Sequence, residues 1–276
     1  MAVPAPMAVL GAGSWGTALA IALARSGREV RLWAHDAAHV QAMRAARCNA
    51  RYLPDAPWPA SLQVVERIDS AVAGCDDVLV VVPSHAFRDV LGSLAEVLPK
   101  GCDCAWATKG FDPGSGKLLH EVALQLLPVG TCVAAVSGPS FASEVAAGLP
   151  TAITVAAPDA EQAQRLRHAL HGERLRAYSN DDLVGVGVGG AVKNALAIAA
   201  GIADALHFGA NARAALISRG LHETSRLCVA LGGQRETMMG LAGLGDLVLT
   251  CTDDQSRNRR FGLALGAGVS SADAVA

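Results

Sequence analysis

Short apolar runs alternate with amphipathic or alanine-rich segments over the first two-thirds of the chain. The apolar runs predict strands at residues 7–10, 29–33, 78–82, 103–107, 133–136 and 151–156. The segments between them predict helices, of which the clearest cover residues 17–26, 86–98 and 118–127. This alternation predicts an α/β fold with a doubly wound parallel sheet that is covered by helices on both faces.

The pattern changes near residue 180. Residues 183–206, residues 213–231 and a segment around Phe261 read as helices with no strand between them. Residues 247–252, "LVLTCT", are β-prone locally but lie among helical neighbours. We therefore predict an α/β domain over residues 1–179 and an all-helical domain over residues 180–276.

Three glycines, Gly11, Gly13 and Gly16, follow the first predicted strand and open the next helix. In this context the first glycine permits a tight turn, the second lets a pyrophosphate approach the backbone, and the third lets helix pack close to strand. The helix N-terminus then presents N–H groups and a positive dipole end to the phosphates. We interpret this stretch as a dinucleotide-binding, Rossmann-type loop, and a tight turn without a ligand is the alternative.

The end of the second predicted strand indicates which dinucleotide is used. NAD-binding domains place an acid there to hold the ribose 2′-hydroxyl. In "EVRLWAHD" the strand ends at Ala34 and His35, whose side chains leave room for a 2′-phosphate. Asp36 is the residue that could instead serve NAD. The sequence therefore favours NADP over NAD as the cofactor and leaves dual use open.

Lys193 lies in the middle of the apolar, glycine-rich stretch "VGVGVGGAVKNALAIAAG". Its helical neighbours Gly189, Gly190 and Ala197 are small, so a nicotinamide ring or a substrate could approach the ammonium. Apolar surroundings lower the pKa of a lysine in general and a nearby carboxylate raises it, a combination that suits proton transfer near neutral pH. The alternative is a buried stem that carries its amine to solvent.

Further polar candidates follow in "GLAGLGDLVLTCTDDQSRNRRFG". Asp246 stands alone among glycines and leucines, which is typical of a carboxylate that pairs with a buried cation. Ser256, Arg257 and Asn258 offer a hydroxyl, a guanidinium and an amide in succession, a set suited to phosphate. We interpret the two remaining arginines, at positions 259 and 260, as a solvated basic patch.

Two more candidate segments follow predicted strands of the first domain. Lys109 lies in "WATKG", and Gly138, Ser140 and Ala142 lie in "SGPSFA". Open α/β sheets bind their ligands at the carboxyl ends of strands. This shared location favours a binding role over the alternatives of a surface lysine and a proline-containing turn.

The composition narrows the class of protein. The chain has 276 residues, of which 51% are hydrophobic and 17% charged, enough for a folded core. With a formal net charge of −2, the protein has no overall positive electrostatic field that would attract a polyanion, so we expect no nucleic-acid partner. The seven cysteines include no C-x-x-C pair, so we expect free thiols. The spaced histidine pairs have no third ligand nearby, so we expect no metal site.

Compartment and membrane association follow from the same sequence. Residues 183–203 could pass for a membrane span, but Lys193 at mid-span and the many glycines and alanines favour a buried helix. The start "MAVPAPMAVLGAG" lacks the basic region of a signal peptide. Because free thiols are typical of a reducing compartment, we expect a cytoplasmic protein without a transmembrane segment.

A series of sequence blocks carries a family resemblance. The blocks are "GAGSWGTALA", "RCNARYLP", "VVVPSH", "WATKG", "SGPSFASEVAAGLPTA", "GGAVKNALAIAAG", "ANARAALISRG" and "GLAGLGDLVLTCTDDQSRNRRFG". In these blocks the chain resembles the bacterial NAD(P)-dependent glycerol-3-phosphate dehydrogenases over nearly its whole length. The resemblance implies reversible reduction of dihydroxyacetone phosphate to sn-glycerol 3-phosphate with NAD(P)H, which supplies glycerol phosphate for phospholipid synthesis.

The resemblance also implies roles for individual residues. Lys193 matches the proton acceptor of the family. The positions that match cofactor contacts of the family are Ser14, Trp15, His35 and Ala142. Those that match contacts to both cofactor and substrate are Lys109 and Arg257. Those that match substrate contacts are Gly138, Ser140, Asp246, Ser256 and Asn258. The implied partner is a small phosphorylated substrate, with a homodimer as an option.

One departure from the family concerns the end of the chain. Family members continue beyond "SSADAVA" through a glycine-containing segment that also contacts the cofactor, so we expect a truncated chain whose helical domain is incomplete. Two alternatives to the leading function stay open at this point. One is a β-hydroxyacid dehydrogenase that acts on a carboxylate substrate, and the other is a truncated chain that binds the cofactor without turnover.

Overall fold

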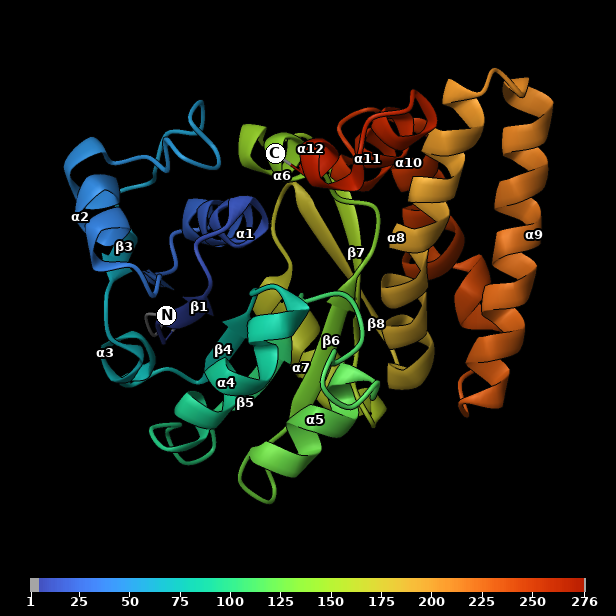
Figure 1. The fold of residues 1–276 in the computed structure, drawn as a ribbon. Coiled ribbons are helices and arrows are strands. Elements are labelled where there is room, and N and C mark those ends of the chain that lie inside the picture. Colours follow the sequence, from blue (N-terminus) through green and yellow to red (C-terminus); the bar gives the residue numbers. More distant parts are fainter. Residues whose placement is uncertain (1–4, 276) are drawn as a thin grey trace. The chain divides into compact units, whose positions relative to one another are not determined.

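The computed structural model describes residues 5–275, which form two compact units (Figure 1). The first unit contains the chain up to Val136 together with Ser140–Leu183. The second contains Ser137–Pro139 together with the chain from Val184 onward. The first unit holds the sheet, and the second is helical.

One eight-stranded sheet, in the order β3-β2-β1-β4-β5-β6-β7-β8, forms the centre of the first unit. The pairs β1–β2, β1–β4, β2–β3, β4–β5, β5–β6 and β7–β8 run parallel. The order of the first six strands is that of a Rossmann-type sheet, and its switch point lies at β1. The strands cover Met7–Leu10 (β1), Val30–Trp33 (β2), Leu62–Val65 (β3), Asp77–Val80 (β4), Asp103–Trp106 (β5), Val133–Ser137 (β6), Thr151–Ala156 (β7) and Leu175–Asn180 (β8).

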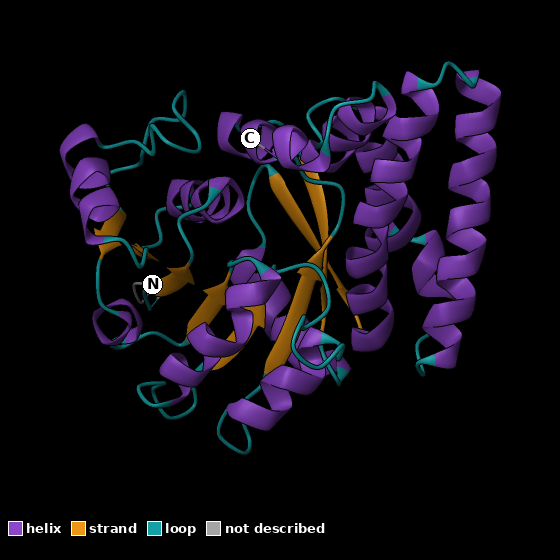
Figure 2. Ribbon diagram, in the orientation of Figure 1, coloured by secondary structure: helices purple, strands orange, loops and turns teal. Residues whose placement is uncertain are grey.

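Helices lie on both faces of this sheet, as the secondary-structure colours of Figure 2 show. The α/β fold class predicted from the alternation of apolar runs and helical segments is confirmed. The helices of the first unit cover Ser14–Arg25 (α1), Ala37–Ala46 (α2), Ile68–Val72 (α3), Ser84–Ala95 (α4), Leu119–Leu126 (α5), Ala142–Ala147 (α6) and Ala160–Leu170 (α7).

The six strands predicted from apolar runs are present, with ends that differ by one or two residues at most. The two strands that the sequence pattern missed, β3 and β8, are the outer strands of the sheet. In β8, buried Leu175 and Ala177 alternate with exposed Arg176 and Tyr178. A strand that is covered on one face carries polar residues at every second position, so it lacks the continuous apolar run that marks a central strand.

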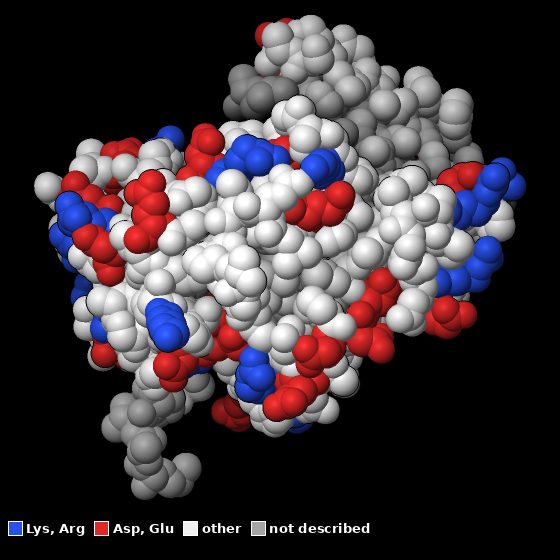
Figure 3. All heavy atoms as spheres, turned by 90° about the horizontal axis from the view of Figure 1, so that it is seen from below, with Lys and Arg blue, Asp and Glu red and all other residues white. Residues whose placement is uncertain are grey.

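The core of the first unit lies against the central strands. All four residues of β1 are fully buried, and α4 covers the sheet with Phe87, Leu91 and Leu94. On the face of the molecule that Figure 3 shows, acidic and basic side chains are interspersed around a broad uncharged area. A face of mixed sign agrees with the small net charge of −2.

The second unit consists of helices, as predicted. Among these, α8 and α9 are the long ones, and a 3₁₀ turn and a π-helical turn lead into α10. The elements cover Leu183–Ala205 (α8), Gly209–Ala230 (α9), Glu236–Met239 (η1), Leu241–Gly245 (η2), Asp246–Thr252 (α10), Arg257–Gly266 (α11) and Ser271–Val275 (α12).

The β-prone segment 247–252 is helical and belongs to α10. Its buried residues Leu247, Thr250 and Cys251 recur at helical spacing, and Leu247 and Cys251 pack against Ala197 and Ala200 of α8. β-propensity mainly reflects how well a side chain fits a half-buried sheet surface. Since this segment buries its apolar residues against a helix instead, packing overrides the local preference.

Close backbone contact holds α8 and α11 together within the second unit. A Cβ on Gly262 would lie 2.1 Å from the Ile198 carbonyl oxygen, and a Cβ on Gly201 would lie 2.2 Å from the Arg259 carbonyl oxygen. Each helix therefore uses a glycine where the other helix's backbone passes. The glycines of the apolar stretch in α8 are thus explained in part by helix packing.

By length and composition alone, α8 would qualify as a membrane span among the described helices. Its most apolar 18 residues are 44% buried inside the structure, and Lys193 lies within the helix. The apolar character of α8 is therefore used at least partly for packing against α10 and α11.

We expect Gly262→Ala to destabilise the protein by about 1–3 kcal/mol, because the new methyl group would overlap the Ile198 carbonyl and push α11 from α8. Gly92→Ala is the matched control, since Gly92 is also helical but a Cβ there meets nothing within 4 Å. The control should stabilise slightly, by up to about 1 kcal/mol. Urea unfolding measures both changes, and equal effects of the two substitutions would contradict the packing argument.

Candidate active site

The glycine-rich loop joins β1 to α1, and its glycines meet different steric demands. Gly11 has a φ of +123°, and a Cβ there would lie 2.4 Å from the Val81 carbonyl oxygen. A Cβ on Gly16 would lie 1.9 Å from the carbonyl oxygen of Gly11, so α1 packs directly on the turn. Nothing lies within 4 Å of a Cβ placed on Gly13. The loop is therefore closed at its first and third glycines and open at the second, where a phosphate needs access.

The N-terminus of α1 has the features of an anion site. Gly13 is its N-cap and supplies no side-chain cap, and the Thr17 amide makes the first intrahelical bond to the Gly13 carbonyl at 2.9 Å. The first turn contains no acidic residue. The amides of Ser14 and Trp15 thus belong to the uncapped first turn, which the positive end of the helix dipole makes attractive to phosphate. The residues present fit a dinucleotide.

The end of β2 separates the three residues that bear on cofactor choice. Ala34 is buried and His35 is exposed. Asp36 caps α2, and its Oδ1 accepts hydrogen bonds from the Ala38 and His39 amides at 3.0 and 3.2 Å. The hydrogen bond from the His39 amide is the main cause that holds the pKa of the Asp36 carboxyl below its ordinary value. Asp36 therefore has a structural task as a helix cap.

Lys109 follows β5, two strands from β1 in the sheet. The neighbouring Thr108 hydroxyl donates to the Val82 carbonyl at 2.8 Å, which fixes the end of this segment, and Lys109 itself is half-buried. Because β1, β4 and β5 run parallel, Lys109 and the glycine-rich loop follow strands that end at the same edge of the sheet. After β6, Gly138 has a φ of +137°, and Ala142 is the first residue of α6.

Lys193 and Asp246 form a buried ion pair in the second unit. Nζ of Lys193 lies 2.6 Å from Oδ1 of Asp246, and the two side chains are 12% and 2% exposed. Nζ also donates to the Thr250 hydroxyl oxygen at 3.1 Å, and this hydroxyl donates to the Asp246 carbonyl at 2.6 Å. The carboxylate and the hydroxyl hold the ammonium in one place, in a site that excludes most water.

The position of Asp246 depends on the chain just before it. The π-helical turn η2 ends at Gly245, and Asp246 begins α10. A Cβ on Gly189 would lie 2.4 Å from the Ala242 carbonyl oxygen, so α8 admits the backbone of η2 one turn before Lys193. The sequence suggested that this small residue makes room for a cofactor or substrate. That interpretation is wrong for Gly189, because the space beside it is filled by the protein's own backbone.

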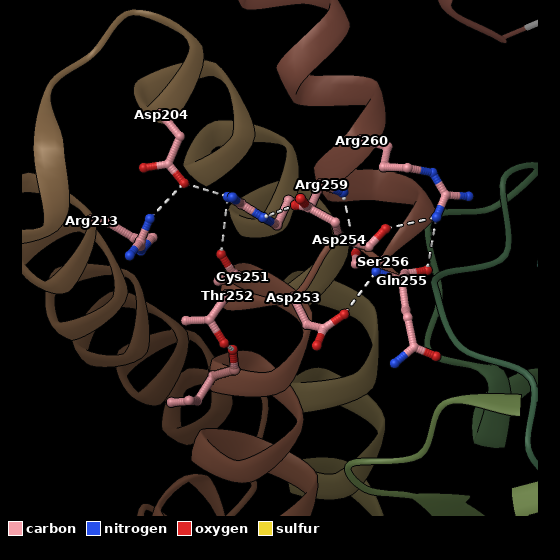
Figure 4. A network of polar contacts seen from close by, with 11 residues as sticks. Asp204, Arg213, Cys251, Thr252, Asp253, Asp254, Gln255, Ser256, Arg259 and Arg260 are labelled. Atoms are coloured by element: carbon pink, nitrogen blue, oxygen red, sulfur yellow. Dashed lines mark hydrogen bonds and ion pairs between the residues drawn. The ribbon is translucent and has the colours of Figure 1, made fainter. Parts of the chain in front are cut away.

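The segment 253–260 is held by a charge network, shown in Figure 4. Nη1 of Arg259 pairs with the Asp204 carboxylate, and Nε of Arg259 donates to Asp254 at 2.9 Å. Asp204 also pairs with Arg213 at 2.8 Å. Burial disfavours the charged form of Asp204, but hydrogen bonds from the two arginines outweigh it and lower the pKa of this carboxyl.

The basic-patch interpretation is therefore wrong for Arg259, which is only 7% exposed, whereas Arg260 is exposed as expected. The Ser256 hydroxyl caps α11 by accepting from the Arg259 amide at 3.2 Å. Arg257, the first residue of that helix, is exposed. Asn258 donates from Nδ2 to Oδ1 of Asn194 at 2.8 Å, which places it next to the residue that follows Lys193.

Sequence reasoning missed two polar partners of this site. Thr250 lies one helical turn after Asp246, but the β-prone reading of its segment concealed that relation. Asn194 directly follows Lys193, and nothing in the sequence indicated that it would meet Asn258. Burial raises the pKa of the nearby Cys251 thiol to about 11, so this cysteine stays neutral. Among residues 5–275, no group of three His, Cys, Asp or Glu side chains could hold a metal ion.

The fold and these sites define a class of protein. A Rossmann-type unit offers an uncapped helix N-terminus beside an open glycine, and a helical unit holds an immobilised ammonium next to a carboxylate. Dinucleotide binding together with a lysine placed for proton transfer is typical of an NAD(P)-dependent dehydrogenase.

Comparison with known proteins makes the assignment specific. Residues 6–163 match the family model of the NAD-dependent glycerol-3-phosphate dehydrogenase N-terminus, and residues 182–276 match that of the C-terminus. The glycerol-3-phosphate dehydrogenase [NAD(P)+] of Nitrosococcus oceani is 59% identical over 260 residues, covering 94% of this chain and 76% of its own. That of Thioalkalivibrio sulfidiphilus is 58% identical over 271 residues, covering 98% and 81%.

A solved structure agrees with these relatives. The crystal structure of glycerol-3-phosphate dehydrogenase from Coxiella burnetii superposes with a TM-score of 0.95 at 52% identity, covering 99% of this chain and 84% of that one. The chain belongs to the NAD-dependent glycerol-3-phosphate dehydrogenase family, and the resemblance seen in the sequence blocks is confirmed.

We expect Asp246→Asn to lower the free energy of unfolding by about 3 kcal/mol, because it leaves the buried Lys193 ammonium without a charged partner. Lys193→Met leaves the Asp246 carboxylate without its cation, and the double variant Lys193→Met/Asp246→Asn removes both charges and should be more stable than either single variant. Glu223→Gln, which breaks the exposed ion pairs with Arg219 and Arg226, is the control and should have little effect. Urea denaturation measures the wild type and these four variants. Simple additivity of the two single changes would show that the pair is not coupled.

Proposed function

We propose that this chain catalyses the reversible reduction of dihydroxyacetone phosphate to sn-glycerol 3-phosphate with NAD(P)H. The observation that carries the proposal is the buried contact of Lys193 with Asp246 at 2.6 Å, in a chain of this dehydrogenase family. We assign cofactor binding to residues 1–179 and substrate binding to residues 180–276. The proposed setting is the cytoplasm, where the product supplies phospholipid synthesis, and a homodimer is the proposed assembly.

When bound, NAD(P)H supplies the hydride for the carbonyl carbon. Negative charge then develops on the carbonyl oxygen, and the Lys193 ammonium stabilises it and delivers the proton. In the oxidising direction the neutral amine of Lys193 takes the hydroxyl proton. Asp246 keeps the amine in place together with Thr250 and, because it is only 2% exposed, does so without competition from water.

The substrate phosphate is proposed to meet the start of α11. Arg257 offers an exposed guanidinium there, and Asn258 offers an amide that is oriented by Asn194. Ser256 acts through its cap on α11, since its hydroxyl accepts the Arg259 amide. The remaining proposed substrate contacts are Lys109, Gly138 and Ser140.

Cofactor contacts are assigned to the glycine-rich loop and to residues near it. Gly11, Gly13 and Gly16 shape the loop, and we propose contacts from Ser14, Trp15, His35, Lys109, Ala142 and Arg257. NADP is the favoured cofactor. Asp36, which follows His35 in the chain, is engaged as a helix cap, and the exposed guanidinium of Arg51 lies 3.8 Å from its Oδ2. A cation beside the strand end favours a 2′-phosphate over a 2′-hydroxyl.

Lys193→Met should lower kcat by about 10²–10⁴-fold, because the substitution keeps the stem but removes the charge and the transferable proton. The Kd for NADPH should barely change. Steady oxidation of NADPH is followed with dihydroxyacetone phosphate and with a panel of β-keto acids, and Lys100→Met, at an exposed position, is the control. Faster turnover of a keto acid by the wild type would instead support a β-hydroxyacid dehydrogenase. A near-normal kcat with weakened NADPH binding would move Lys193 from proton transfer to cofactor contact.

His35→Asp should raise the Kd for NADPH by about tenfold and that for NADH much less, because the added carboxylate repels a 2′-phosphate. Gln41→Glu adds the same charge at an exposed position of α2 and is the control. Fluorescence titration of the reduced cofactors gives both constants. An equal loss of NADPH and NADH affinity would mean that the side chain at position 35 does not discriminate between a ribose 2′-phosphate and a 2′-hydroxyl.

A further inference from the structure

The block "RCNARYLP" contains a fully buried polar side chain to which the proposed function assigns no role. Asn49 is 0% exposed and lies between α2 and β3, outside the glycine-rich loop. Its Nδ2 donates to the Ala12 carbonyl at 2.9 Å and to the Thr17 hydroxyl oxygen at 2.8 Å. Both hydrogens of the amide are thereby directed to the loop and to the start of α1.

The third contact of this side chain leads to α2. Oδ1 of Asn49 lies 3.0 Å from Nε2 of His39, and since Oδ1 can only accept, His39 donates from Nε2. The backbone carbonyl of Asn49 accepts from the Leu53 amide at 2.7 Å and closes the turn that carries Arg51. Asn49 therefore joins the glycine-rich loop, α2 and the turn 49–53 at one buried point.

The bond to Ala12 has a directional consequence for the loop. In a planar trans peptide the carbonyl and the following N–H point to opposite sides. When Asn49 holds the Ala12 carbonyl on its own side, the N–H of Gly13 must point away from Asn49. Gly13 is the glycine with open space around its Cα and the N-cap of α1.

We propose that Asn49 is a positioning residue for the cofactor, which acts by fixing the Ala12–Gly13 peptide so that the Gly13 N–H is presented to the pyrophosphate. This inference rests on the proposed binding of NAD(P)H at the glycine-rich loop. Asn49 itself touches no phosphate. It contributes by keeping the loop in the binding conformation before the cofactor arrives, which reduces the ordering cost of binding.

The test compares Asn49→Ala and Asn49→Asp with wild type. Asn49→Ala removes all three side-chain hydrogen bonds, including the one to the Ala12 carbonyl, and should raise the Kd for NADPH about tenfold or more. Asn49→Asp keeps the shape but cannot donate to the Ala12 carbonyl when ionised, and it adds a negative charge near the phosphates, so its loss should be larger. The Kd for adenosine 2′-monophosphate, which lacks the pyrophosphate, and the KM for dihydroxyacetone phosphate should change less than about threefold.

Ser61→Ala is the matched control, because the Ser61 hydroxyl donates to the Ala24 carbonyl at 2.9 Å and so holds the other end of α1. It should lower Tm without changing the Kd for NADPH. If the Asn49 variants do not fold, Thr17→Val removes one acceptor and leaves Asn49 in place, and it should raise the Kd for NADPH by a few-fold.

Three results would overturn the inference. The first is an NADPH Kd within twofold of wild type in the folded Asn49 variants or, where those do not fold, in Thr17→Val. The second is an equal loss of NADPH affinity in Ser61→Ala, and the third is an equal loss of affinity for adenosine 2′-monophosphate. Failure of the wild-type chain to bind NADPH would instead contradict the proposed function.

Discussion

The contact between Lys193 and Asp246 is the interaction on which the arrangement of the helical unit depends. An ammonium and a carboxylate that are 12% and 2% exposed are stable together only if each keeps the other neutralised. This requirement fixes α8 against the start of α10, and Thr250 completes the shell of the ammonium. Packing also brings the ion pair together. Gly189 leaves room for the backbone of η2 and so lets Asp246 come within 2.6 Å of Lys193.

A second charged group stabilises the chain beyond α10. Arg259 connects Asp204 at the end of α8 with Asp254 in the loop before α11, and it also donates to the Cys251 carbonyl at 3.4 Å (Figure 4). Because the guanidinium is buried and paired on two sides, it holds the loop through directional hydrogen bonds. The exposed neighbour Arg257 thus projects from a helix start whose position is fixed.

In the first unit the glycine-rich loop must be held in one conformation while its backbone amides stay accessible. Steric contact does this at Gly11 and Gly16, where no side chain would fit. At Gly13 no such contact exists, and the buried amide of Asn49 supplies the constraint through the neighbouring Ala12 carbonyl. A loop of this kind can be both open and ordered, because the hydrogen bond that orders it comes from the side opposite the opening.

The sequence by itself determined the fold class, the six central strands and the glycine-rich loop, because buried parallel strands and close backbone approaches demand particular residue types at each position. It also singled out Lys193 and Asp246 as misfits in apolar surroundings. It missed β3 and β8, whose outer positions permit polar residues, and left segment 247–252 undecided between strand and helix. Only the tertiary structure paired Lys193 with Thr250, buried Arg259 and placed Asn49 against the loop, because these contacts join residues far apart in the chain and leave no local periodicity.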